Sequence, residues 1–232
     1  MKKLLSIFAV IVFLSTFLTI ANAGLTGTYY NLPNTHPDME GNITGWQPGY
    51  VESTLIGAMP TLTPYGAGII KQWDWWTSPH LSFTRVDSDS DLQSAFTTSW
   101  FPIPASLPGD RYDFAVNWSG KFYVADDKSY TYSMGSDDDS WLFIDKKLVL
   151  DLGGVHGMTY NNYTLPLTQG YHDIDIFFAE RHVVESGFQL NFFSDLEPTQ
   201  PVPEPGTLLL LGSGLLGLAG YAKVRFGRKN KK

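Results

Sequence analysis

Residues 136–157 constrain the fold most, because their apolar side chains fall on both alternating positions of a strand. Residues 141–144 read Trp-Leu-Phe-Ile without a polar interruption, which is typical of a strand covered on both faces. Residues 145–147 are polar, and residues 148–150 resume the apolar pattern. The stretch therefore predicts a β-hairpin inside a larger fold.

Acidic residues flank this predicted hairpin. Asp137, Asp138 and Asp139 come directly before its first strand, and Asp151 and His156 follow its second. The glycine-rich loop after Asp151 lets the backbone turn sharply, so we expect both groups at one end of the hairpin. One interpretation is a solvated acidic turn. The other is a cluster of hard oxygen ligands, which suits Ca²⁺.

The rest of the central chain alternates between short strand patterns and turn signals. Strands are expected at 24–31, 111–124, 130–134, 163–167, 171–178 and 187–193. We find no convincing amphipathic helix among them. This pattern predicts an all-β fold, an antiparallel β-sandwich.

Two clusters in the central chain allow more than one interpretation. Trp73, Trp75 and Trp76 are expected to pack in the core, with a sugar-stacking platform as the alternative. Residues 87–91 alternate Asp and Ser, which suggests a calcium loop. Leu92 and Thr98 occupy the Gly and Glu positions that an EF-hand requires, so we interpret the segment as a solvated turn.

The first residues have the pattern of a secretory signal. A basic start (Lys2, Lys3) precedes an apolar run at 4–20 and a small-residue site at 21–23. We expect a signal peptide over residues 1–23, with cleavage before Gly24.

The C-terminal residues have a second targeting pattern. Pro203-Glu204-Pro205 precedes an apolar run at 207–222, and six Lys or Arg follow in the tail at 223–232. This order predicts a single transmembrane helix with a cytoplasmic basic tail. It resembles the PEP-CTERM sorting signal, and the resemblance implies that an exosortase in the inner membrane recognises and cleaves the tail near this motif.

The central chain is strongly acidic and lacks cysteine. Residues 24–201 hold eight Lys and Arg against 22 Asp and Glu, a net charge of −14. This charge argues against nucleic acid as a partner and for cations as ligands. Without disulfides, the domain must rely on its core. We expect the sandwich at 24–196 and a linker at 197–206.

Several motifs, in order, are similar to the fibro-slime domain of the protective-antigen-type β-sandwich clan. They are residues 36–40 (His-Pro-Asp-Met-Glu), 137–139 (Asp-Asp-Asp), 151–156 (Asp-Leu-Gly-Gly-Val-His) and 179–182 (Ala-Glu-Arg-His). Lys146 stands where the family's turn has Gly, so it must adopt a positive φ or the turn must change type.

The resemblance implies a calcium site. In the clan's calcium-dependent adhesins, two aspartates joined by a cis peptide hold a Ca²⁺ that binds sugar hydroxyls, and the matching pair is Asp137-Asp138. Asp139, Asp151 and Glu180 are further candidate ligands. Where those adhesins have an asparagine, this chain has Glu180-Arg181-His182. We also expect Glu180 and Arg181 to form a buried ion pair.

Two functions remain open at this point. One is an exported surface or matrix module that binds carbohydrate or exopolysaccharide, with calcium. The other is a structural slime or biofilm component without a defined ligand. An enzyme is not expected. The carboxylates are consecutive rather than across a cleft, and residues 24–196 show no metalloprotease or nucleophile motif.

Overall fold

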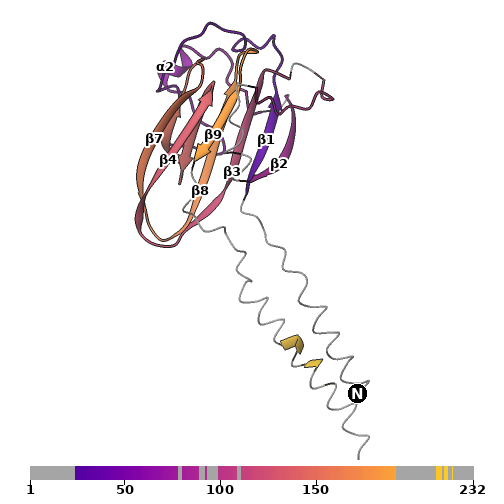
Figure 1. The fold of residues 1–232 in the computed structure, drawn as a ribbon, viewed down its shortest axis with the longest axis vertical. Coiled ribbons are helices and arrows are strands. Elements are labelled where there is room, and N and C mark those ends of the chain that lie inside the picture. The colour runs from indigo at the N-terminus through magenta and orange to yellow at the C-terminus, as the bar shows by residue number, and fades with distance from the viewer. Residues whose placement is uncertain are drawn as a thin grey trace, which may run out of the picture. The chain divides into compact units, whose positions relative to one another are not determined.

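A computed structural model describes residues 24–77, 80–88, 92, 99–108 and 111–191, with six further residues near the C-terminus (Figure 1). Within these ranges, the elements are nine strands and one short helix. They are β1 (Gly24–Asn31), α2 (Pro64–Ala67), β2 (Leu81–Ser88), β3 (Phe114–Val124), β4 (Lys128–Asp137), β5 (Asp139–Ile144), β6 (Lys147–Leu152), β7 (Thr159–Leu167), β8 (Gly170–Glu180) and β9 (Gly187–Asn191).

The strands form two antiparallel sheets. One has the order β2-β1-β3-β8-β5-β6 and the other the order β7-β4-β9. The sheets pack face to face, since Trp118 of β3 stacks on Phe188 of β9 with ring centroids 4.7 Å apart. The predicted all-β antiparallel sandwich is therefore confirmed.

The outer face of the six-stranded sheet carries a second apolar cluster. Trp75 and Trp76 are buried there against Trp141, Phe143 and Phe177. The next residues along β5, Leu142 and Ile144, belong instead to the cluster between the sheets. This double coverage explains why residues 141–144 are apolar at every position. Trp75 and Trp76 are therefore core residues.

Two turns bear on the expectations from the sequence. In the β5–β6 turn, Asp145 and Lys146 both have positive φ, 48° and 65°, as a two-residue type I′ hairpin requires. The interpretation of residues 87–91 as a solvated turn is wrong at Asp87. That side chain is buried in β2, where it accepts hydrogen bonds from Tyr29 and Trp118. It is buried because these two core side chains carry donors that need an acceptor.

The compact unit at residues 22–199 contains all of these strands. A second unit, made of residues 1–21 and 200–232, falls almost wholly outside the described residues. The predicted signal peptide, the Pro-Glu-Pro motif and most of the predicted membrane helix lie in that undescribed part. Among the residues that the structure describes, no helix is long and apolar enough to cross a membrane.

Candidate metal centre and its pocket

The three consecutive aspartates lie where the chain crosses from one sheet to the other. Asp137 is the last residue of β4 in the three-stranded sheet, and Asp139 is the first residue of β5 in the six-stranded sheet. Asp138 is the link between them, and the Asp137–Asp138 peptide bond is cis, as the resemblance implies. The crossover places these side chains at one end of the sandwich.

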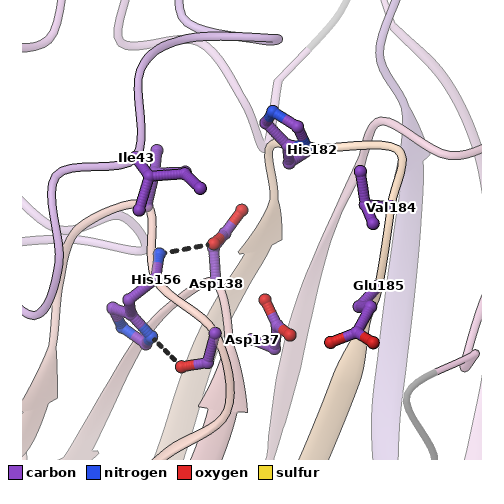
Figure 2. Close-up of a pocket in the computed structure, with 9 residues that line it drawn as sticks. Ile43, Asp137, Asp138, His156, His182, Val184 and Glu185 are labelled. Atoms are coloured by element: carbon purple, nitrogen blue, oxygen red, sulfur yellow. Dashed lines mark hydrogen bonds between the residues drawn. The ribbon is translucent and has the colours of Figure 1, made fainter.

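Backbone donors hold the Asp138 carboxylate, which is buried. Its Oδ1 accepts the N–H of His156 at 2.7 Å (Figure 2), and its Oδ2 accepts the N–H of Arg181 at 3.1 Å. The first donor lies in the loop after β6 and the second directly follows β8. The predicted return of His156 to the end of the hairpin that carries the aspartates is therefore observed.

Glu180, the last residue of β8, completes a cluster with Asp137 and Asp138. One ligand oxygen from each residue lies within 4.8 Å of the others. The Oε1 of Glu180 accepts the N–H of His182 at 2.9 Å. Its Oε2 is buried without a hydrogen-bond partner among the described residues, although the Ser186 hydroxyl lies near enough to lower the pKa of Glu180. A buried oxygen without a partner is costly unless a ligand satisfies it.

The electrostatics of the cluster favour a cation. Burial raises the pKa of Asp137 to about 6. Burial and the charges of Asp139 and Asp137 raise the pKa of Asp138 to about 8. Burial and the charge of Asp138 also raise the pKa of Glu180 well above its usual value. Without a counter-ion, the three groups therefore resist ionising together. Because all three candidate ligands are carboxylate oxygens, the set would fit Ca²⁺ better than a softer metal.

The other predicted ligands lie outside this cluster. Asp139 accepts hydrogen bonds from the Gly154 N–H at 2.5 Å and from Arg181 Nη1 at 3.1 Å. Asp151 accepts the backbone N–H groups of Gly49 at 2.7 Å and Gly153 at 3.0 Å. Both carboxylates hold the surrounding loops in place.

The prediction that Glu180 and Arg181 form an ion pair is wrong. Neighbours along a strand point to opposite faces, and the guanidinium of Arg181 instead pairs with Asp139.

A pocket of about 160 Å³ opens onto Asp137 and Asp138. Figure 2 shows Ile43 and His156 on one side of these carboxylates, with Val184 and Glu185 on the other and His182 above. Val155 and Gly157 complete the lining. The pocket therefore has two carboxylates at its floor and largely apolar side chains along its walls. The sequence analysis identified the two carboxylates but missed the wall residues, which come from three separate loops.

A second cluster that the sequence analysis missed joins His36, Asp74 and His80. Nε2 of His36 lies 2.9 Å from Oδ1 of Asp74, and Nε2 of His80 lies 3.4 Å from the same oxygen. However, Nδ1 of His36 accepts the N–H of Asp38 at 3.2 Å, so the ring proton lies on Nε2. That nitrogen donates to Asp74 and has no lone pair for a metal. His36 and Asp74 therefore form a hydrogen-bonded pair between loops, whereas Nε2 of His80 is buried without a hydrogen-bond partner among the described residues.

Comparison with known families gives two matches. A model described as the PA14 domain matches residues 73–202, more than half of the chain. A model described as a PEP-CTERM protein-sorting motif matches residues 201–225.

Among curated proteins, the chain is similar to two from Dictyostelium discoideum. Protein psiG is 25% identical over 236 residues, which cover 82% of this chain and 33% of psiG. Protein psiE is 33% identical over 107 residues, which cover 36% of this chain and 21% of psiE. The chain thus spans a third or less of the length of each relative.

Two solved structures are similar at low identity. The PA14 domain of the antifreeze protein MpAFP is 13% identical with a TM-score of 0.40, and the match covers 77% of this chain and 88% of that domain. The Epithelial Adhesin 9 A domain from Candida glabrata, solved in complex with Galβ1-4GlcNAc, is 17% identical with a TM-score of 0.42. That match covers 77% of this chain and 83% of the adhesin domain.

Proposed function

The chain belongs to the PA14 domain family, and from this premise we propose that it is an exported surface module that binds carbohydrate through a Ca²⁺ ion. Asp137, Asp138 and Glu180 would hold the ion at the base of the pocket. The ion would supply positions at which sugar hydroxyl oxygens bind.

The observation that carries this proposal is the buried Oε2 of Glu180, which has no geometric hydrogen-bond partner among the described residues. One oxygen of the same carboxylate lies within 4.8 Å of ligand oxygens from Asp137 and Asp138. Ca²⁺ takes six to eight oxygen ligands in proteins. Three carboxylates leave several of these positions to water or to a ligand entering from the pocket. The amides that hold Asp138 orient its two oxygens before any ion arrives.

Binding fits this site better than catalysis. A general acid or base needs a carboxylate that is free to exchange a proton with substrate. Both oxygens of Asp138 already accept backbone N–H groups, and Glu180 is fully buried. These carboxylates are therefore better suited to binding a cation than to transferring a proton.

The PEP-CTERM motif at residues 201–225 supports the export part of the proposal. The chain would pass through the inner membrane, remain anchored there by its C-terminal segment, and reach the cell surface or extracellular matrix after an exosortase-type enzyme cleaves it. An exopolysaccharide or a cell-surface glycan is then the partner that the module meets.

A glycan-array experiment with the purified full chain tests the proposal. We expect binding in millimolar calcium, loss of binding in EDTA, and loss in Asp137→Asn/Asp138→Asn and Glu180→Gln variants. Asp126→Asn, an exposed aspartate that does not line the pocket, is the matched control and should bind like the wild type. If the folded wild type binds no glycan with or without calcium, the module is structural and the proposal is wrong.

A further inference from the structure

We propose that Glu185 sets the charge of the sugar that the pocket accepts, so that the site selects a hexosamine with a free ammonium group and rejects a uronic acid. This inference rests on the proposed carbohydrate-binding function. It concerns Glu185 in the pocket wall, a residue that is not one of the predicted metal ligands.

Glu185 lies in the loop between β8 and β9, and its side chain is exposed at the pocket rim. Figure 2 shows its carboxylate directed toward Asp137 across the opening. Its charge acts on Asp137, whose pKa it helps to raise after the larger effect of burial. In the described part of the chain, no Lys, Arg or His nitrogen lies within 4 Å of the Glu185 carboxylate. Its negative charge is therefore available to a ligand.

Neither histidine of the pocket lies within 4 Å of the Glu185 carboxylate, so neither pairs directly with its charge. The two ring nitrogens of His156 lie 3.0 Å from the Gly157 carbonyl oxygen and 2.9 Å from the Leu152 carbonyl oxygen, so the ring is engaged with the backbone. In Figure 2 His182 lies above the carboxylates, in the same loop between β8 and β9 as Glu185.

A bound calcium ion leaves the site negative. Its two positive charges against the carboxylates of Asp137, Asp138 and Glu180 leave one negative charge, and Glu185 adds a second. A sugar carboxylate held at the ion would face Glu185 across the opening, and like charges placed in this way are strongly unfavourable. An ammonium group on the carbon beside a calcium-bound hydroxyl would face the same carboxylate as a favourable partner.

The apolar walls are consistent with one sugar ring. Val155, Val184 and Ile43 contact the space above the carboxylates, where they would meet the C–H face of a pyranose. Since these residues carry no charge, discrimination among sugars of one configuration falls to Glu185.

The experiment compares matched methyl glycosides that differ only in charge. The neutral hexoside, the 2-amino hexoside and the uronide are each titrated in gluco, galacto and manno configuration into the purified full chain, at about pH 7 in millimolar calcium. In the sugar configuration that the site prefers, we expect the amino glycoside to bind most tightly, the neutral glycoside less tightly and the uronide most weakly. The two ends of this order should differ about tenfold or more. The difference should shrink when salt is raised, because the charges lie near the surface.

Glu185→Gln is the decisive variant, and Glu52→Gln is its matched control. Glu52 is also exposed but does not line the pocket. We expect Glu185→Gln to keep its calcium-dependent thermal shift and to bind all three charge forms within about threefold of one another. Glu52→Gln should preserve the wild-type order.

Three outcomes would overturn the inference. A uronide that binds the wild type as tightly as the neutral sugar contradicts it, while carbohydrate binding itself stands. If Glu185→Gln binds the amino, neutral and uronide glycosides in the same order as the wild type, another group selects the charge of the sugar. If no sugar binds the wild type in calcium, the proposed function fails and this inference fails with it.

Discussion

Arg181 and Asp139 form a buried ion pair directly behind the candidate calcium site, with Nη1 of the arginine 3.1 Å from Oδ2 of the aspartate. The guanidinium lies over the ring of Trp75 at 5.0 Å, and its Nε donates to the Asp38 carbonyl oxygen at 2.9 Å. The backbone N–H of Arg181 meanwhile holds Asp138. One residue thus joins the tryptophan cluster, the N-terminal loop and the candidate metal site.

We predict that Arg181→Met lowers the free energy of unfolding by about 3–5 kcal/mol, because it leaves the Asp139 charge buried without its partner. Combining it with Asp139→Asn should recover part of the loss, so the two effects should not add. Urea denaturation measures both. Lys121→Met, which breaks an exposed pair with Asp173, serves as control and should have little effect. Additive losses would mean that the two side chains are not coupled.

Calcium should stabilise the folded chain through Asp137 and Asp138. For a dissociation constant near 0.1 mM, about 1 mM calcium stabilises the fold by ~1.4 kcal/mol. In a domain of this size, that corresponds to a rise in Tm of roughly 3–6 °C. Thermal melting in EDTA and in calcium checks this. The shift should vanish in Asp137→Asn/Asp138→Asn and persist in Asp126→Asn. A shift that survives in the double variant would place the ion elsewhere.

Gly154 should tolerate no side chain. Its φ is 114°, and an added Cβ would clash with the carbonyl oxygen of Gly45 in the adjacent loop. Its N–H also donates to Asp139. Gly154→Ala should therefore lower stability and weaken calcium binding, since the same loop carries the His156 amide that holds Asp138. Gly157→Ala, where a Cβ meets open space, is the comparison. Equal melting temperatures for the two variants would contradict this account.

His172 should make stability fall as pH rises from about 6.5 through its raised folded pKa. Burial alone would lower its pKa, but hydrogen bonds to Asp145 at 2.6 Å and to the Thr168 carbonyl oxygen at 2.8 Å outweigh it and raise the pKa above 6.5. A raised folded pKa gives stability that is fully present below the unfolded pKa and is lost as pH rises through the folded value. The stability advantage of wild type over His172→Gln should therefore be larger at pH 6 than at pH 9. NMR titration of the ring gives the pKa directly, and a value at or below 6.5 would refute the prediction.

Processing of the tail should depend on Glu204. In a host with an exosortase, we expect the mature protein to begin at Gly24 and to lose the segment after residues 203–205. Without the enzyme, the protein should stay in the membrane fraction. Intact mass and fractionation measure both. Release of Glu204→Ala to the same extent as wild type would show that the motif is not what the enzyme recognises.

The strand pattern and the family relationship could be predicted from local sequence. Residues 141–144 predicted a strand covered on both faces, and Leu142 and Trp141 do belong to different clusters. The positive φ at Lys146 followed from the two-residue turn. Asp87 was misjudged, because alternating Asp and Ser resembles a surface turn whether or not Tyr29 and Trp118 lie above it.

The sequence by itself determined the β-sandwich, the acidic pair Asp137-Asp138 and the two targeting patterns, since each is encoded by neighbours along the chain. The tertiary structure alone decided which carboxylate joins that pair. β5 and β8 pair in the register Asp139↔Ala179, which brings Glu180 beside Asp138 from 42 residues away in sequence. Backbone amides and Arg181 engage Asp151 and Asp139 instead. Alternation along a strand predicts the face on which a side chain lies, whereas the register between distant strands decides what it meets there.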